Sequence, residues 1–385
     1  MKRKIPQSTP QTPVRLSRRP RFLVFAWCGI GDLILGTPLL SSIKKLLPDS
    51  RITVVLRDDL PPELLKKNPD VAEFFHYPGI GVLKLFPSCG AAFKNIWVGI
   101  CCLLWEIATV CRLRLQRFDA SMYLLAGGIT PGEALITLLC GAKIRIGPHV
   151  ESKSGYTSRC YTRFITWDNR RHAVENCLDN LRLIGFSSFD TSLRLVLDEN
   201  DKRLARTFLI AHGVIETDIV VGIHPGGANE RKPYWPADRF AAVAAHVTRD
   251  YGYRVVVFFG PGETHYLDAF RGTSIIPAVG LGFGVVCGII AVCRLFISSD
   301  TGLGHSAAAL QVPTLTIFGN GNRRKHHHWG NKCFEIDKLP PTHMTDATTA
   351  YSAGEAGRQA ILSVTVEEVV SLAGNALREP ARRAV

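Results

Sequence analysis

Apolar runs of strand length alternate with helix-like stretches along the first half of the chain. The apolar runs are Phe22–Ala26, Ile52–Leu56, Ser121–Leu125 and Lys143–Ile146, and the stretches with helical spacing are Leu33–Leu47, Pro131–Cys140 and Arg170–Ile184. A glycine turn, Gly29–Gly31, joins the first run to the first helical stretch. Gly185 follows the last stretch, at the position where helices commonly end. This order predicts βαβ units.

The same alternation begins again after an irregular stretch that ends in polar residues. The predicted strands are Ile219–Ile223, Arg254–Phe259, Leu295–Ile297 and Thr314–Phe318, and the predicted helices are Pro236–Tyr251, Gly304–Leu310 and Val366–Leu377. Such alternation predicts an α/β fold of parallel sheets with helices on both faces. We expect two Rossmann-like domains, at residues 21–190 and 216–385, joined by a linker at residues 191–215. Ligands would bind in a cleft at the carboxyl ends of the strands.

Composition and charge fit a folded protein that binds anions. The chain has 385 residues, 46% of them hydrophobic, and a formal net charge of +13. Residues 1–20 are rich in basic residues and proline and contain no acid, so we expect a disordered basic leader there. The polar stretch Ile5–Ser17 argues against a signal peptide. The charge favours phosphorylated substrates or anionic lipid, whereas no recognised nucleic-acid-binding motif is present, so nucleic acid is not an expected partner.

Cysteine placement indicates a reducing compartment. The chain has 11 cysteines and no C-x-x-C pair, which gives no support to structural zinc or thioredoxin-like chemistry. Several lie beside a predicted strand or in apolar stretches that we expect to be helical: Cys28, Cys101, Cys102, Cys111, Cys287 and Cys293. Cysteine is a common small buried residue. We therefore expect reduced cysteines in a cytoplasmic protein.

The segment Ile96–Cys111 is the one candidate for contact with a membrane. It is shorter than the roughly 20 apolar residues that span a bilayer, and Glu106 interrupts it. Two interpretations remain open. It is a buried or half-buried helix, which we favour, or a helix that lies on an anionic membrane surface, where its tryptophans and the arginines that follow would sit at the headgroup level.

The first loop with candidate chemistry is CGIGDLILGTP at residues 28–38. Ile34 stands where a dinucleotide fingerprint needs glycine, and the Gly-Lys-Ser/Thr of a phosphate loop is absent. Asp32 lies at the entrance of the predicted helix. It is either a helix N-cap or a general base whose carboxylate faces the cleft between the two domains.

The second loop, at residues 224–236, has the sequence HPGGANERKPYWP. The backbone amides of its glycines, among them Gly226, and the cations Arg231 and Lys232 suit a diphosphate. The alternative is an ordinary surface loop, because Trp235-Pro236 also resembles a structural helix start.

The third loop, at residues 298–309, has the sequence SSDTGLGHSAAA and leads from a strand into an alanine-rich helix. The free amides at the start of that helix, near Thr301 and Gly302, form an anion site. Asp300 cannot bind phosphate, so its functional role would be to bind sugar hydroxyls. His305 is either a proton donor or a packed histidine.

The run RRKHHHW at residues 323–329 suggests a metal or phosphate site at first sight. Three adjacent histidines cannot all face one metal from a strand or a helix, so a basic loop is the preferred interpretation. The chain also has no D-x-D pair, the usual carboxylate clamp for a metal–diphosphate. The sequence therefore favours a transferase that needs no metal over a metal-dependent one, and no cofactor is expected.

In this order and spacing, the three loops resemble the ADP-heptose:lipopolysaccharide heptosyltransferase family, glycosyltransferase family 9. Residues 299–310, SDTGLGHSAAAL, look like the family's D-[ST]-G-x-x-H-x-A-A motif, and residues 224–236 look like its H-P-G…K-x-W-P segment with one extra residue. Gly31-Asp32 through Thr37-Pro38 is similar to its G-D-x-x-x-x-T-P start, and Gly260–Glu263 resembles its glycine-Glu turn. The resemblance covers about residues 21–378.

The resemblance implies a GT-B fold, with an acceptor-binding N-terminal domain and a nucleotide-sugar-binding C-terminal domain. It implies an inverting, metal-independent transfer, in which Asp32 would be the base and Lys232, with the helix start at Thr301-Gly302, would hold the diphosphate. Asp300 would bind the donor sugar and Glu263 the nucleoside. His224, Gly226 and His305 would complete the donor site.

The function that follows is transfer of a sugar, expected to be heptose from an ADP-sugar, to a glycolipid or other surface-glycan acceptor at the inner face of the cytoplasmic membrane. Two alternatives remain. One is another nucleotide sugar, because Asn320–Arg324 departs from the family's usual Pro-Thr sequence. The other is a non-catalytic protein that binds a nucleotide sugar, against which the joint presence of Asp32, Lys232 and Asp300 argues.

Overall fold

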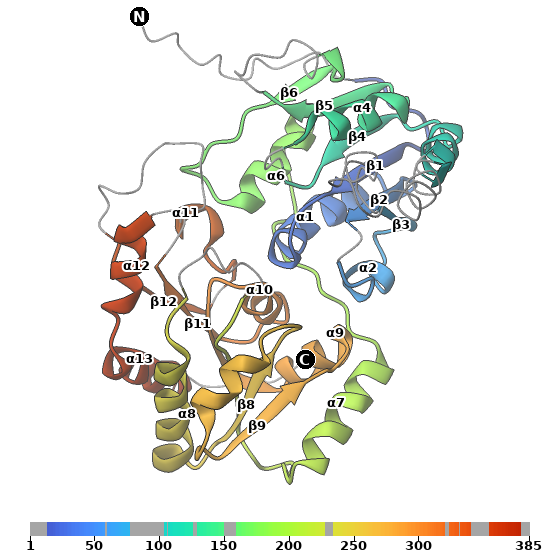
Figure 1. Ribbon diagram of the computed structural model, residues 1–385. Coiled ribbons are helices and arrows are strands. Elements are labelled where there is room, and N and C mark those ends of the chain that lie inside the picture. Colours follow the sequence, from blue (N-terminus) through green and yellow to red (C-terminus); the bar gives the residue numbers. More distant parts are fainter. Residues whose placement is uncertain are drawn as a thin grey trace, which may run out of the picture. The chain divides into compact units, whose positions relative to one another are not determined.

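The computed structural model describes ten stretches of the chain, at residues 14–57, 60–77, 104–105, 107–125, 129–149, 159–227, 234–319, 323–330, 332–339 and 354–378. The chain forms two compact units. Unit 1 comprises residues 1–168 and 173–191, and unit 2 comprises residues 169–172 and 192–385. Each unit is built on its own parallel sheet, and each is described by itself below (Figure 1).

Unit 1 contains a six-stranded sheet in the order β3-β2-β1-β4-β5-β6, in which every neighbouring pair is parallel. The strands are β1 (Arg21–Ala26), β2 (Arg51–Arg57), β3 (Glu73–Tyr77), β4 (Ala120–Tyr123), β5 (Ile144–Pro148) and β6 (Arg163–Ile165). The helices with assigned bounds are α1 (Ile30–Leu46), α2 (Glu63–Lys66), α4 (Pro131–Leu139) and α6 (Ala173–Arg182). The helical residues 107–115 precede β4.

Helix α1 contains a proline that its neighbours accommodate. Pro38 has no amide hydrogen to donate to the carbonyl of Ile34, one turn earlier. The hydroxyl of Thr37 donates to that carbonyl instead, at 2.7 Å. A Cβ on Gly36 would collide with the side chain of Leu124, so this glycine lets the helix approach the segment after β4. The motif Gly36-Thr37-Pro38 is therefore explained by packing.

Unit 2 contains a second six-stranded parallel sheet, in the order β12-β11-β10-β7-β8-β9. Its strands are β7 (Val220–His224), β8 (Arg254–Phe259), β9 (Ile275–Val279), β10 (Cys293–Ser299), β11 (Thr314–Phe318) and β12 (Cys333–Asp337). Its helices are α7 (Glu199–Ala211), α8 (Ala237–Tyr251), the 3-10 helix η2 (Thr264–Phe270), α9 (Phe283–Ile290), α10 (Gly302–Ala309), α11 (Arg323–His326), α12 (Gly354–Leu362) and α13 (Val366–Arg378).

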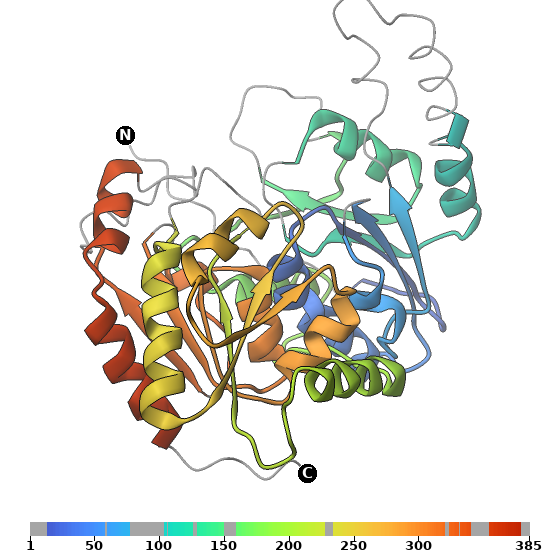
Figure 2. The same ribbon diagram turned by 60° about the horizontal axis from the view of Figure 1, so that its bottom comes forward.

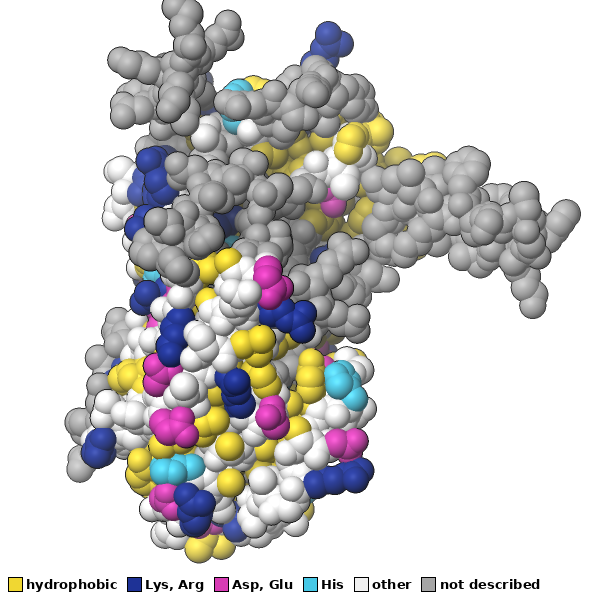
Figure 3. Space-filling model, turned by 60° about the vertical axis from the view of Figure 1, so that its left-hand side comes forward, with side chains coloured by type: hydrophobic (Ala, Val, Ile, Leu, Met, Phe, Trp, Pro, Cys, Tyr) yellow, Lys and Arg dark blue, Asp and Glu magenta, His cyan; other side chains and the backbone are white. Residues whose placement is uncertain are grey.

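Helices cover both faces of the unit 2 sheet. Helices α8 and α13 lie side by side on one face, and α7 and α9 lie side by side on the other (Figures 1 and 2). The surface of unit 2 that forms the lower part of Figure 3 mixes basic and acidic side chains, with small apolar areas between them. The excess positive charge is therefore not gathered on this part of the surface.

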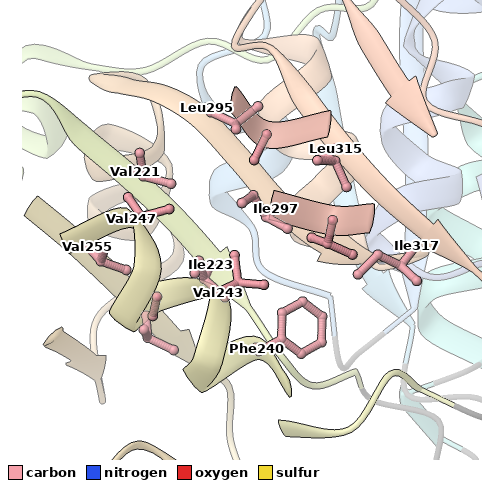
Figure 4. Packing of buried hydrophobic residues seen from close by; sticks show 14 of the residues in the cluster. Val221, Ile223, Phe240, Val243, Val247, Val255, Leu295, Ile297, Leu315 and Ile317 are labelled. Atoms are coloured by element: carbon pink, nitrogen blue, oxygen red, sulfur yellow. The ribbon is translucent and has the colours of Figure 1, made fainter. Parts of the chain in front are cut away.

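Alternate residues of the unit 2 strands enter two separate cores. On β8, Val255 and Val257 belong to the cluster under α8, which also contains Phe240, whereas Val256 and Phe258 belong to the cluster on the opposite face (Figure 4). Burial on both faces is why the strands appear in the sequence as continuous apolar runs instead of alternating patterns.

Most of the predicted elements are present, with some corrections. The predicted helix Arg170–Ile184 begins only at Ala173, and Cys293, predicted to be helical, opens strand β10. The stretch at residues 191–215, expected to be a linker, holds helix α7. Ser17, which precedes β1, is joined to unit 1 because its Oγ donates to Asp119, and the backbone amide of Arg21, the first residue of β1, donates to the same carboxylate oxygen.

The cysteines in the described part of the chain are all free. Burial raises the pKa of several of these thiols, for example that of Cys140 to about 12. In the described segments, no single helix is long and apolar enough to cross a membrane, although the bent pair formed by Glu355–Leu362 and Val366–Arg378 passes the same criteria of length and composition. Most of the apolar segment predicted as a membrane candidate, at residues 96–103 together with Glu106, lies outside the described residues.

Candidate functional site

Three loops of unit 2 carry most of the predicted donor-site residues, and they follow adjacent strands. Strands β10, β7 and β8 are neighbours in the sheet, so their carboxyl ends lie at one edge. His224 is the last residue of β7, Glu263 follows β8, and Asp300 and Thr301 follow β10. Side chains from residues far apart in the sequence therefore meet at this edge.

His224 links the other two loops through its imidazole. Nδ1 lies 3.1 Å from the hydroxyl of Thr301, and Nε2 lies 3.0 Å from Oε2 of Glu263. An ionised carboxylate only accepts hydrogen bonds, so Nε2 carries the donated proton. In the neutral ring, Nδ1 then accepts from the Thr301 hydroxyl. This fixes both the ring orientation and the position of Thr301.

Glu263 is a buried carboxylate held in its ionised form. Burial by itself opposes ionisation, but the hydrogen bonds from His224 and from the amides of Gly260 and Gly227 outweigh it and leave the pKa of Glu263 below its usual value. The Gly260 amide donates to Oε2 at 2.6 Å. A Cβ on Gly226 would lie 2.7 Å from the Glu263 carboxyl carbon, which accounts for the glycine.

The third loop enters helix α10 through Thr301, which is the N-cap. Its hydroxyl accepts from the amide of Gly304 at 3.4 Å. The first amides of a helix have no acceptor within the helix and carry partial positive charge, which favours a phosphate. Residues 302–309 are glycine, alanine and other small or apolar residues apart from His305. The helix start at which the sequence predicted an anion site is therefore present, and its binding of an anion stays a prediction.

His305 is packed. It is buried, its Nε2 lies 3.4 Å from Oδ1 of Asp300, and its ring meets that of His328 edge to face at 4.7 Å between centroids. Its Nδ1 has no hydrogen-bond partner among the described residues. Of the two interpretations that the sequence left open, the packed histidine is the one that this environment favours.

His328 was expected in a basic loop near the cleft, but it is a buried residue of this region. The three consecutive histidines differ in environment, and His328 alone is fully buried. Its Nδ1 lies 2.7 Å from the hydroxyl of Thr316. Burial, followed by the neighbouring His305, holds its pKa well below the usual value, so the ring is neutral. A Cβ on Gly304 would lie 2.5 Å from its Nε2, which places His328 beneath the first turn of α10.

Analysis of the sequence missed His172, because it lies in a short segment of unit 2, residues 169–172, whose sequence neighbours belong to unit 1. Its ring stacks on Trp329 at 4.4 Å, and its Nε2 donates to the carbonyl of His327 at 2.9 Å. Burial lowers its pKa to about 3. His172 therefore holds the segment that contains His328.

Of the two remaining predicted site residues, one belongs to unit 1 and the other lies outside the described residues. Asp32 lies in the first turn of α1 in unit 1 and is half-buried. The interpretation of Asp32 as the N-cap is wrong, because Gly29 occupies that position and makes no side-chain cap. Lys232 lies outside the described residues, as do residues 228–233 in general.

The end of the second loop is anchored to the core. Trp235 is buried, and its indole Nε1 donates to the carbonyl of Val364 at 3.0 Å. Pro236 forms the N-cap of α8, as expected for a structural helix start. As for metals, the residues that the structure describes include no group of three or more His, Cys, Asp or Glu side chains that could hold an ion.

The two parallel α/β units form a GT-B fold, which the chain shares with the structure of the E. coli ADP-heptose lipopolysaccharide heptosyltransferase II at 17% identity and a TM-score of 0.66 over 93% of this chain and 98% of that one. The model of glycosyltransferase family 9 (heptosyltransferase) matches residues 112–350. The chain belongs to this family, and the resemblance deduced from the motifs is confirmed.

Relatives of known function and known structure agree with this assignment. The chain is 25% identical over 334 residues to lipopolysaccharide heptosyltransferase 3 of Escherichia coli K12, covering 83% of this chain and 90% of the relative. The crystal structure of a family 9 glycosyl transferase from Veillonella parvula matches 96% of this chain and 100% of its own length, with 22% identity and a TM-score of 0.76. The E. coli heptosyltransferase WaaC, solved with ADP, matches 92% of this chain and 99% of its own, with 16% identity and a TM-score of 0.67.

Proposed function

We propose that this glycosyltransferase transfers a heptose from ADP-heptose to a lipopolysaccharide-type acceptor, with inversion and without a metal. The observation that carries the donor half of the proposal is the linkage of His224 to both Thr301 and Glu263 at the start of α10. It supports a preorganised site for the diphosphate of a nucleotide sugar. The relatives support heptose and ADP, since one is a lipopolysaccharide heptosyltransferase and another is a heptosyltransferase solved with ADP.

In this proposal, the leaving diphosphate is held by backbone amides and by one cation. Departure of the nucleoside diphosphate builds negative charge, which the amides near Thr301 and Gly302 and the ammonium group of Lys232 stabilise. A single preorganised donor of this kind contributes roughly 3–4 kcal/mol to transition-state stabilisation. Asp300 binds hydroxyls of the donor sugar, beside His305.

Glu263 would bind the nucleoside through the part of its carboxylate that His224 and Gly260 leave available. Oε2 already accepts from both of these groups. His224 and Gly226 would act indirectly: His224 orients Glu263 and Thr301, and Gly226 leaves room for the carboxylate. His224 is therefore a positioning residue, which acts through Glu263 and Thr301.

Asp32 would be the general base of the transfer. Its carboxylate takes the proton from the acceptor hydroxyl while the hydroxyl oxygen bonds to the anomeric carbon. The bond from that carbon to the diphosphate oxygen breaks on the opposite face, so the configuration inverts. A positioned base contributes on the order of 100- to 10,000-fold to the rate. The half-buried position of Asp32 in the first turn of α1 supports this role.

The acceptor we propose is a lipid-linked saccharide at the cytoplasmic face of the inner membrane. A net charge of +13 supports an anionic acceptor and contact with an anionic leaflet. A second candidate function is the same transfer with another nucleotide sugar. The sequence from Asn320 to Arg324 departs from the family pattern. For this reason UDP and GDP are included in the test below.

The deciding experiment is titration calorimetry with ADP, ADP-heptose, UDP and GDP in the presence of EDTA. Wild type is compared with Lys232→Ala and with Lys202→Ala, a control that removes a lysine from the exposed surface of α7. We expect ADP compounds to bind, Lys232→Ala to weaken binding at least about tenfold, and the control to bind as wild type does. Tighter binding of UDP or GDP than of ADP would mean that the donor is a UDP-sugar or a GDP-sugar. Absence of binding to all four compounds would overturn the proposed donor site.

A further inference from the structure

The helical residues 107–115 of unit 1 expose apolar side chains on the face that turns away from the core. On the inner face, Thr109 and Leu113 are buried, and Leu113 belongs to the core cluster of the unit. On the outer face, Ile107 is 51% exposed and Leu115 is 81% exposed. Ala108 and Cys111 between them are also exposed. A helix that covers a core normally has a polar outer face, so this one requires an explanation.

The apolar outer face extends beyond these residues. Leu104 is 60% exposed and Trp105 is 43% exposed, although the Trp105 ring also lies 6.2 Å from that of Tyr77 at the end of β3. At the other end, the guanidinium group of Arg114 donates to the carbonyl of Leu139, itself 43% exposed. We call the exposed side chains of Leu104, Trp105, Ile107, Ala108, Cys111, Leu115 and Leu139 the outer patch.

Arginines accompany the outer patch. Arg112, Arg114 and Arg117 are exposed. Arg112 lies over the ring of Phe75 at 4.7 Å and forms an ion pair with Glu73 at 3.2 Å. Residues 104–117 contain three arginines and one acid, Glu106, so they carry net positive charge even when the pair with Glu73 is counted. This helix therefore carries both large exposed apolar side chains and exposed cations.

We propose that the outer patch docks on an anionic lipid surface, with the helix lying in the plane of the headgroups. Apolar side chains would enter the boundary between headgroups and acyl chains, and the guanidinium groups would meet lipid phosphates. Each basic residue near such a surface contributes about 1 kcal/mol. Tryptophan suits this boundary because its ring is apolar and its N–H is polar.

Charge decides between lipid and a second copy of the chain as the occupant. A symmetric dimer through this face would bring the same arginines of both copies together, and like charges at an interface oppose association. An anionic bilayer neutralises them instead. The proposal deepens the proposed function by naming the surface that would meet a membrane-borne acceptor, but it does not depend on which nucleotide sugar is bound.

The test is flotation of the full chain with vesicles of phosphatidylethanolamine and phosphatidylglycerol, compared with pure phosphatidylcholine. The variant is Ile107→Ser/Leu115→Ser, which changes only exposed side chains. The matched control is Ile210→Ser/Ile215→Ser in unit 2, where the two isoleucines are 71% and 64% exposed. Thermal unfolding checks that both variants remain folded, and light scattering reports their oligomeric state.

We expect wild type and control to bind the anionic vesicles, and the helix variant to bind at least about tenfold more weakly. Wild-type binding should also weaken as salt increases. Equal binding by the helix variant and wild type would overturn the proposal. The proposal would also be overturned if the helix variant and the control lost vesicle binding equally, or if wild type did not bind the vesicles. A change from dimer to monomer in the helix variant would overturn it as well, because the patch would then be an interface between two copies.

The proposed function is tested separately, by measuring the affinity of the helix variant and of wild type for ADP. Retained ADP affinity together with lost vesicle binding would support the docking surface and leave the donor site untouched. Absence of ADP binding in wild type together with normal vesicle binding would remove the proposed donor and leave the docking surface standing.

Discussion

His224 Nε2 lies 3.0 Å from Oε2 of Glu263, and this hydrogen bond joins the loops that follow two neighbouring strands. The same carboxylate oxygen accepts from the Gly260 amide, and the other ring nitrogen of His224 reaches Thr301. The start of α10 is therefore held by a chain of hydrogen bonds that crosses three loops. Loss of one member should disturb the others, because each fixes the orientation of the next.

The substitution Glu263→Gln tests this chain. The amide can still accept from His224 and Gly260 through its oxygen, but its NH₂ group then faces the amide of Gly227, which donates to the carboxylate in wild type. A buried donor without an acceptor costs about 1–3 kcal/mol, so we expect that loss of stability in urea unfolding, together with weaker ADP binding. Asp268→Asn, at an exposed acid of η2, is the matched control. Unchanged stability in Glu263→Gln would mean that the carboxylate charge is not needed.

The stability of unit 2 should fall in acid because of His172. Burial lowers its folded-state pKa from 6.5 to about 3. Between these values the unfolded chain binds the proton and the folded chain does not, so stability decreases as the pH falls from about 6.5 towards 3. One such proton contributes at most about 1.4 kcal/mol per pH unit.

The variant His172→Phe keeps a ring to stack on Trp329 but cannot titrate. We expect a shallower decline of the unfolding free energy between pH 6.5 and 4, measured by urea titration at each pH. His265→Phe, at an exposed histidine of the same unit, is the control. If the two variants follow the same pH profile, His172 does not govern the acid response.

The elements that the sequence predicted well are those whose burial is uniform. Strand β8 was predicted at its observed bounds because its apolar residues fill cores on both faces. Strand β9 was missed because alternate residues, Pro277 and Val279, are exposed at the edge of the sheet. Strands β3 and β12 were missed as well; both are edge strands, and most of their residues are half-buried, so they form no continuous apolar run.

In the candidate site, the sequence identified residues but not their contacts. His224, Glu263 and Thr301 were each assigned to a donor site, yet their mutual hydrogen bonds depend on the strand order β10-β7-β8, which the sequence does not reveal. His328 was hidden for a different reason. Three identical residues in a row give no sign of which one is buried, and that is decided by packing under Gly304.

The substitution Gly304→Ala should destabilise unit 2 and weaken nucleotide binding. The new Cβ would lie 2.5 Å from His328 Nε2 and 2.8 Å from Ser298 Oγ, so the helix start or the imidazole must move. Overpacking of a filled site typically costs about 1–3 kcal/mol. The measurement is the unfolding free energy together with the affinity for ADP.

Two further variants identify the cause. Gly330→Ala adds a methyl group where the nearest atom is 3.8 Å away and should leave both quantities unchanged. Adding His328→Ala to Gly304→Ala should cost less than the sum of the two single changes, because the clash is removed. Additive effects in the double variant would show that the glycine acts independently of His328.

The substitution Asp32→Asn should abolish most of the transfer while leaving the protein folded and able to bind ADP. The amide is nearly the same size as the carboxylate but cannot take the acceptor proton, so we expect kcat to fall by about 100- to 10,000-fold. Gly29, not Asp32, is the N-cap of α1. The stability lost therefore includes no N-cap contribution, but it includes the interaction of one acid with the helix dipole, about 0.3–1 kcal/mol. Glu63→Gln, which removes an acid from the first turn of α2, controls for that interaction. If Asp32 is the general base, the rate of single-turnover transfer should fall in Asp32→Asn while the affinity for ADP is preserved. Equal activity of Asp32→Asn and Glu63→Gln would reassign Asp32 to a structural role in α1.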